Sequence, residues 1–151
     1  NYRLYAGKIY GTLPYPFLNV HAGNQSFFLQ REAFNLMNYF EFVSDTWLGL
    51  NFEHKLQGLI LDRIPLVRKL KLRTIYTLKA VVGDFDARHL TKMNLPNNTN
   101  KLSYTKPYVE VNVGVDNIFK YIRIDAIWRL TYLDSEDASN FGVKFMFTGN
   151  F

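Results

Sequence analysis

The sequence contains no cysteine, which excludes disulfide frameworks, thiolate chemistry and cysteine-ligated zinc sites. It also lacks long apolar runs: residues 59–61 are typical of those present, whereas a transmembrane helix needs ~20 apolar residues in succession. A helical membrane protein is therefore excluded. An initiating methionine and a signal peptide are absent too, and the chain opens within a strand-like stretch, so we expect a fragment whose N-terminal part is missing.

Residues that carry enzyme chemistry are scarce as well. Glycine-rich phosphate loops, nucleophile elbows and paired catalytic carboxylates are absent. His21, His54 and His89 are scattered over a loop, a strand and a second loop, and none has a carboxylate at zinc-type spacing. We therefore expect no catalytic residue, no cofactor and no metal ion, and we expect the protein not to be an enzyme.

Large amphipathic side chains are abundant instead. Aromatic residues make up 17% of the 151 residues, with 13 Phe and 10 Tyr, and charged residues make up 21%. This composition is too apolar for a disordered chain. The net charge of +5 would suit an anionic partner, but the charges follow the strand pattern described next, so we expect no nucleic-acid partner.

Six stretches are predicted to be strands, and five of them alternate apolar and polar residues with period two. The five are residues 47–57, 71–82, 106–115, 121–132 and 141–151. Their apolar phase carries no formal charge, and their polar phase carries Glu53, Lys55, Lys71, Arg73, Lys79, Glu110, Arg123, Asp125, Arg129 and Lys144. The sixth stretch, residues 2–11, is less regular because Arg3 and Lys8 fall in opposite phases.

A soluble antiparallel sheet with one wet face, in a sandwich or a lipocalin-like barrel, would show the same alternation. Strand length separates the two cases, because soluble strands cluster near ~5–6 residues and tilted membrane strands need ~9–11. In lipid the backbone must also satisfy its own hydrogen bonds, so the sheet has to close on itself. The long strands therefore predict an all-β, antiparallel transmembrane β-barrel in the outer membrane of a Gram-negative bacterium.

The connections between the strands alternate in character, as outer-membrane barrels require. Residues 11–40 and 83–105 are long, whereas residues 116–120 form a tight turn. We expect the acidic residues 133–140 to face the cell exterior and the turn to face the periplasm. Residues 63–70 are basic and apolar, which predicts a short helical or interfacial turn with snorkelling cations, or alternatively a lipid-headgroup or partner site.

The polar phase of two neighbouring predicted strands carries four charges: Glu110, Arg123, Asp125 and Arg129. In a barrel these side chains would face the lumen. We expect them to form an ion-pair ladder there, and such ladders are usually structural.

The C-terminal residues resemble the β-signal of outer-membrane proteins. That signal is a polar residue, a glycine two residues later, two hydrophobic residues spaced by one, and a terminal aromatic residue. The matching positions are Asn140, Gly142, Phe145, Phe147 and Phe151. Because the last strand has an open edge until a barrel closes, assembly machinery can recognise it by pairing with that edge. The resemblance implies three kinds of partner: outer-membrane lipid, the outer-membrane assembly machinery, and other outer-membrane or periplasmic proteins.

The resemblance extends over the whole chain. Residues 7–16 and 21–26 resemble a strand and loop near the end of BamA/TamA-type barrels, and residues 33–45, 63–66 and 106–110 are similar to a Bacteroidota family. Members of that family carry an N-terminal carboxypeptidase-regulatory-like domain ahead of a barrel. The resemblance implies that residues 1–151 are the C-terminal part of a single barrel domain, about the last six strands of about sixteen.

The implied function is the assembly or translocation of outer-membrane or surface proteins. The alternative is a barrel that serves as an anchor, scaffold or transport conduit for a periplasmic domain or for partner proteins. BamA/TamA-type barrels carry an Arg-Gly-aromatic tip on a loop that folds into the lumen, and here the corresponding residues 26–32 lack Arg-Gly. Ser26 and Arg31 mark the candidate inward loop, with Arg31 as the substitute for the tip arginine.

Overall fold

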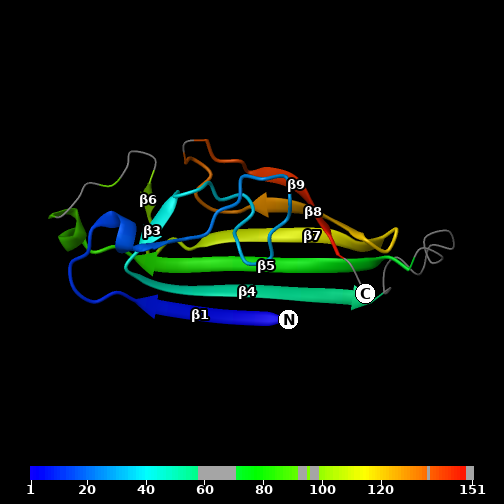
Figure 1. Cartoon of the computed structure of the whole chain (residues 1–151), viewed down its shortest axis with the longest axis horizontal. Coiled ribbons are helices and arrows are strands. Elements are labelled where there is room, and N and C mark those ends of the chain that lie inside the picture. The colour runs from blue at the N-terminus through cyan, green and yellow to red at the C-terminus, as the bar shows by residue number, and fades with distance from the viewer. Residues whose placement is uncertain (58–70, 92–94, 96–98, 136, 149–151) are drawn as a thin grey trace.

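The computed structural model describes residues 1–57, 71–91, 95, 99–135 and 137–148. These residues form one large sheet in which each strand is antiparallel to the next along the chain (Figure 1). Its strands, in spatial order, are β1 (Tyr2–Lys8), β4 (Thr46–Gln57), β5 (Arg73–Asp84), β7 (Tyr108–Ile118), β8 (Ile122–Arg129) and β9 (Phe141–Phe147). The predicted all-β, antiparallel architecture is confirmed. Within the described residues the sheet is open, with β1 and β9 as its edges.

A second, smaller sheet lies at the end of the large sheet where the long connections gather (Figure 1). It contains β2 (Asn19–Val20), β3 (Phe42–Ser44) and β6 (Asn100–Lys101), and the short 3-10 helices η1 (Tyr15–Phe17) and η3 (Ala87–Thr91) lie in the same connections. The β3–β6 pair is parallel, which the sequence pattern did not predict. These connections meet because they carry their own buried apolar side chains, among them Phe42, Val43 and Leu102.

Several strand ends differ from the sequence prediction, and β1, β8 and β9 are shorter than predicted, with 7, 8 and 7 residues. β8 ends at Arg129 although the alternation continues to Tyr132, because the Arg129 guanidinium bonds the carbonyl of Tyr132, whose φ is 54°. β7 runs on to Ile118, past the predicted start of the turn, with a register shift after Val115. The helices within the described residues are too short to cross a membrane.

The register of the strands places the apolar phase of all six on one face of the sheet. The register also decides which residues of β1 lie on this apolar face, because Tyr2 and Leu4 lie opposite Phe52 and Leu50. This apolar face is exposed, and its large exposed side chains are Tyr2, Leu4, Leu48, Phe52, Tyr76, Val113, Ile124, Trp128, Phe141, Val143, Phe145 and Phe147.

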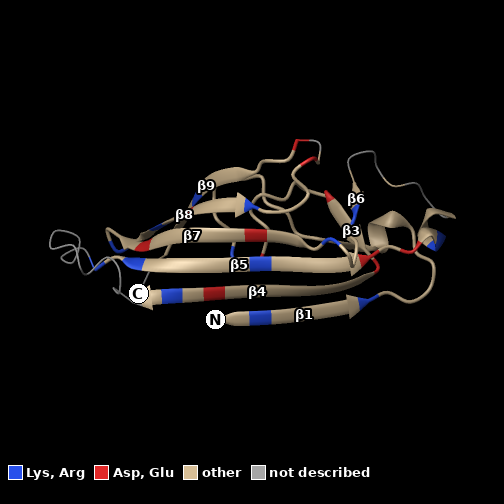
Figure 2. Cartoon of the chain, turned by 180° about the vertical axis from the view of Figure 1, so that it is seen from behind, with Lys and Arg blue, Asp and Glu red and all other residues tan. Residues whose placement is uncertain are grey.

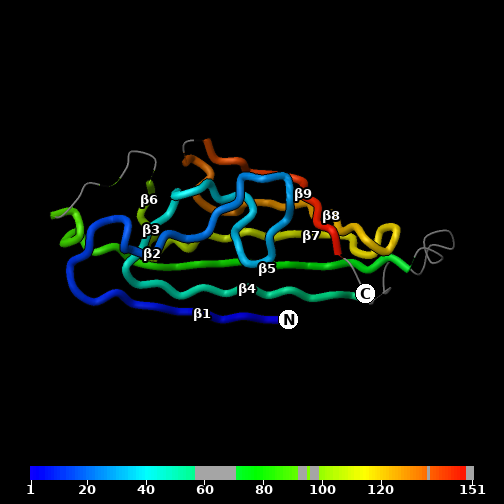
Figure 3. Tube along the Cα trace, in the orientation of Figure 1, coloured from blue at the N-terminus to red at the C-terminus, as the bar shows by residue number. Residues whose placement is uncertain are grey.

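The polar phase lies on the opposite face, which residues 21–41 cover (Figure 3). We call these residues, which connect β2 to β3, the inward loop. Beneath it the charged side chains are buried: Lys79, Glu110, Arg123, Asp125, Arg129 and Lys144 are each at most 8% exposed. Figure 2 shows charges midway along β5 and β7 and in the C-terminal half of β4. The sheet is therefore inverted relative to a water-soluble one, with charges inside and aromatic residues outside.

Candidate functional site

Three charged residues form a row across the centre of the sheet. Lys79 of β5, Glu110 of β7 and Arg129 of β8 are cross-strand neighbours in register. Each of them binds the inward loop. Lys79 Nζ donates to the carbonyl oxygens of Gln30 at 3.0 Å and Ala33 at 2.5 Å. A buried ammonium requires such acceptors, so this lysine ties the loop to the sheet.

Glu110 is the central anchor of the row. Its carboxylate accepts hydrogen bonds from the backbone N–H of Asn35 at 2.8 Å and of Leu36 at 2.7 Å. The hydroxyl of Tyr108 donates to the same carboxylate at 2.7 Å. Glu110 is fully buried, and hydrogen bonds to an ionised acceptor are about twice as strong as neutral ones. The two loop amides, which no strand partner could satisfy, are therefore held by this one side chain.

Arg129 fixes the end of the inward loop. Its guanidinium makes a two-pronged ion pair with Glu41, at 2.6 Å and 3.1 Å, and donates to the Tyr132 carbonyl at 2.7 Å. Glu41 also accepts from the backbone N–H of Asn38 at 2.8 Å. Both members of the ion pair are buried, so removing either one would leave an uncompensated charge.

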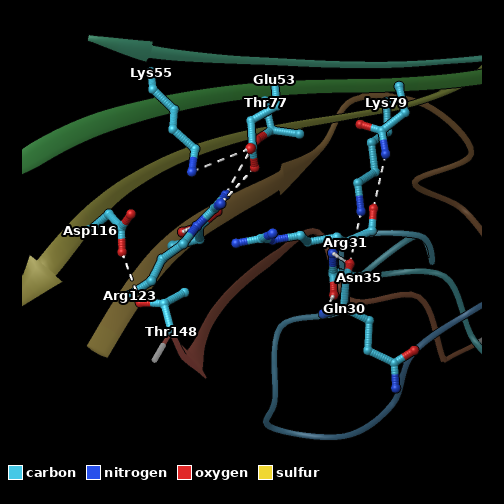
Figure 4. A network of polar contacts seen from close by, with 12 residues as sticks. Gln30, Arg31, Asn35, Glu53, Lys55, Thr77, Lys79, Asp116, Arg123 and Thr148 are labelled. Atoms are coloured by element: carbon cyan, nitrogen blue, oxygen red, sulfur yellow. Dashed lines mark hydrogen bonds and ion pairs between the residues drawn. The ribbon is translucent and has the colours of Figure 1, made fainter. Parts of the chain in front are cut away.

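A second cluster surrounds Arg123, nearer the β7–β8 turn (Figure 4). Arg123 binds Asp125 through two bonds of 2.7 Å and binds Glu53 of β4 at 2.6 Å. A polar cavity of about 330 Å³ lies beside this cluster, lined by Glu53, Arg123, Asn112 and Arg31 among others. Figure 4 shows the Arg31 side chain extending from the inward loop toward Arg123. Arg31 therefore lines the cavity beside the Arg123 cluster from the side of the inward loop.

The predicted charged ladder is divided between these two clusters. Arg123 and Asp125 pair with each other, whereas Arg129 pairs with Glu41 and Glu110 binds loop amides. These residues therefore link the sheet to the inward loop as well as one strand to another. Sequence reasoning did not single out Lys79 and Glu53, although both lie in the polar phase. Glu41 carries no periodic signal, because it lies in an aperiodic segment.

The other predicted site residues are distributed as follows. Ser26 donates to the Asn24 side chain at 2.7 Å and so stabilises a turn of the inward loop. The Asn140 carbonyl bonds the Arg129 N–H, and Phe145 and Phe147 lie on the exposed apolar face. A Cβ on Gly142 would come within 2.8 Å of Leu36, so the glycine admits the inward loop against β9. Phe151, Glu136 and residues 63–70 lie outside the described residues.

We expect His21 to make the packing of the inward loop sensitive to pH. Its Nε2 lies 2.6 Å from Ser44 Oγ, and burial lowers the pKa of His21 from 6.5 to about 4. Folding therefore requires the neutral ring, whereas the unfolded chain takes up a proton below about pH 6.5. We expect the free energy of unfolding to fall as pH drops from 6.5 to 4, by up to about 3 kcal/mol.

Unfolding by urea at pH 7.5 and pH 4.5 checks this expectation. His21→Asn should flatten the pH dependence, whereas His54→Asn, on the exposed face, should leave it in place. An equal slope in wild type and His21→Asn would contradict it.

In the part of the chain that the structure describes, no three His, Asp or Glu side chains gather as a metal ion would require.

Comparison with known proteins connects this architecture to one family. No curated protein and no solved structure matches the chain. The C-terminal domain of a family of unknown function, DUF5686, matches residues 6–89, which is more than half of the 151 residues. The match includes the inward loop, β4 and β5, and therefore Arg31, Glu41 and Lys79. The chain therefore belongs to the DUF5686 family, within its C-terminal domain.

Proposed function

We propose that this chain is part of an outer-membrane β-barrel in a Gram-negative bacterium. Its large sheet contributes about the last six of about sixteen strands to the barrel wall, and its inward loop fills the lumen. The observation that carries the proposal is the inversion of the sheet. An apolar face that spans six strands is exposed, and large exposed patches of this kind mark a surface that something covers. We propose that lipid covers this face, because the face is continuous, free of charge at its centre and rich in aromatic residues.

Strand length and the placement of exposed aromatic residues support a lipid environment. β4 and β5 have 12 residues each and β7 has 11, which suits a tilted crossing of ~9–11 residues. Membrane barrels also carry aromatic residues where the apolar band meets each interface. Exposed aromatic residues occur beyond both ends of the sheet: Tyr10, Phe17 and Tyr104 at the long connections, and Phe119 and Tyr121 at the β7–β8 turn.

Cysteine labelling tests the proposed orientation, and the chain offers a background free of cysteine. In intact cells we expect a membrane-impermeant maleimide to label Asp134→Cys, in the β8–β9 connection, and to spare Phe119→Cys, in the turn. Both variants should react after the cells are lysed, which controls for accessibility. Labelling of the second variant alone in intact cells would reverse the topology, and equal labelling of both would contradict a membrane crossing between them.

For the activity we propose assembly or translocation of other outer-membrane or surface proteins, without a catalysed reaction of its own. The supporting feature is the inward loop, which is tied to the wall at Lys79, Glu110 and Arg129 and carries Arg31 toward the Arg123 cluster. This arrangement resembles the loop of BamA/TamA-type barrels that braces the lumen. The partners we propose are lipid, the assembly machinery acting through the C-terminal strand, and other outer-membrane or periplasmic proteins.

One observation favours a second candidate, a barrel that serves as anchor or scaffold. The inward loop packs against the polar face, and its Asn35 and Met37 are completely buried there. A lumen filled in this way suits a structural support better than an open conduit.

Depletion of the protein in its host separates the two candidates. If it assembles other proteins, the folded, heat-modifiable fraction of several unrelated barrels should fall severalfold within a few generations. Wild-type protein should restore that fraction. If it is an anchor, those barrels should stay folded and only a dedicated partner should leave the membrane, which would overturn the assembly role.

A further inference from the structure

β9 has one edge that no strand of the large sheet covers. The Asn140 carbonyl accepts from Arg129 of β8, and the Thr148 N–H donates to the carbonyl of Tyr121, just before β8. The even-numbered residues of β9 therefore turn toward β8. Because the backbone groups of an edge strand alternate in direction, the odd-numbered residues, including Val143 and Phe145, turn their N–H and C=O groups outward. A strand edge of this kind is a template for pairing with another strand.

The inward loop itself occupies the centre of this edge (Figure 3). Phe145 N–H donates to the Phe27 carbonyl at 3.3 Å, and Leu29 N–H donates to the Phe145 carbonyl at 2.7 Å. Phe28 is thereby paired with Phe145 as a parallel strand would be. We call residues 27–29 the edge cap.

The side chains of the edge cap continue both faces of the sheet. Phe28 lies on the apolar face, with its ring centroid 4.9 Å from that of Phe145. Leu29 points to the opposite face, where it is buried with Ile127 and Met146. Two successive residues that point to opposite faces are what a further strand would provide. The edge cap therefore stands where the next strand of the wall would lie.

The edge cap is held by a short local framework. Asn24 donates from its side chain to the Phe28 carbonyl at 2.7 Å, and Lys144 of β9 donates to the Asn24 carbonyl at 2.5 Å. Only two main-chain hydrogen bonds join the edge cap to β9. A full strand partner would also engage Val143 and Phe147, so it would gain more backbone bonds than the cap gives up.

We propose that residues 27–29 are an exchangeable cap, which shields the β9 edge until the first strand of the same barrel displaces it. This inference rests on the proposed barrel, because only a closing wall brings a competing strand to β9. The cap and that strand cannot both use the outward groups of Phe145. Before closure the cap shields the outward groups of Phe145, so assembly machinery that pairs with this edge has to displace the cap first. Closure then releases the cap into the lumen.

A reversible disulfide between the edge cap and β9, which we call the cap lock, tests the exchange in the full-length protein. Phe28→Cys with Phe145→Cys places two cysteines on paired residues of two adjacent segments, the edge cap and β9. Their ~4.7–4.9 Å spacing falls in the range that a disulfide spans. The protein is oxidised in urea-free detergent and then transferred to phospholipid vesicles. Folding is followed by heat-modifiable migration. The matched control lock is Leu50→Cys with Ala80→Cys, which joins two strands that stay paired throughout.

We expect the oxidised cap lock to fold at least tenfold more slowly than the same protein after reduction. The control lock and the single Phe145→Cys variant should fold at equal rates with and without reductant. Equal rates for the oxidised and reduced cap lock would overturn the exchange, and so would failure of the cap disulfide to form before insertion. Failure of wild-type protein to insert into vesicles would instead contradict the proposed barrel.

Discussion

Val113→Arg is expected to reduce the folded protein in the outer membrane at least tenfold. Val113 lies midway along β7, between Tyr76 and Ala126, and the residue is 40% exposed on the apolar face. In water such a surface substitution would change the free energy of unfolding by only about 0.5 kcal/mol. Against hydrocarbon at mid-depth an arginine costs ~2–4 kcal/mol. The same substitution therefore discriminates between a soluble sheet and a membrane wall.

Outer-membrane fractionation with a heat-modifiability assay provides the measurement. Val113→Leu is the matched control, since it keeps the position apolar and should accumulate as wild type does. Normal accumulation of folded Val113→Arg would contradict lipid exposure of this face. It would then favour a sheet whose apolar face is covered by protein, which was the alternative that the alternation alone left open.

Glu110→Ala is expected to detach the inward loop from the wall. The substitution leaves the amides of Asn35 and Leu36 and the hydroxyl of Tyr108 without their buried acceptor. Each unsatisfied buried donor costs about 1–3 kcal/mol, so we expect the free energy of unfolding to fall by roughly 3–5 kcal/mol. Hydrogen exchange at residues 35 and 36 should accelerate by at least tenfold, because both amides lose their protection.

Two further variants serve as controls for this prediction. Glu110→Gln retains one carbonyl acceptor and should give an intermediate loss, whereas Lys55→Gln, on the same face but partly exposed, should change stability little. Urea unfolding in detergent, together with hydrogen exchange, distinguishes them. If Glu110→Ala left both the unfolding midpoint and the exchange at residues 35 and 36 unchanged, the central anchor would be misassigned.

Much of the large sheet could be predicted from the sequence, because period-two alternation is a local property of each strand. It located β4, β5, β7, β8 and β9 to within a few residues and assigned their charges to one face. It could not assign the face of β1, since Arg3 and Lys8 conflict. Only the pairing of Tyr2 with Phe52 decided that, because register is a property of two strands together.

The candidate site was predictable only in part. Glu110, Arg123, Asp125 and Arg129 could be assigned to the polar face from their phase. Their partners could not be predicted, because Asn35, Glu41 and the carbonyls that bind Lys79 lie in a segment without periodicity. A contact between a strand and an aperiodic loop far away in the chain leaves no local pattern that spacing rules could detect.

The sequence by itself determined that the chain forms long antiparallel strands with charges on one side and aromatic residues on the other. Side-chain alternation follows directly from strand geometry, so this much needs no tertiary information. Tertiary structure alone decided that the inward loop fills the charged face, that β3 pairs with β6 in parallel, and that residues 27–29 cap β9. These contacts depend on how segments far apart in the chain satisfy buried backbone and charged groups, which is settled only when the whole chain packs.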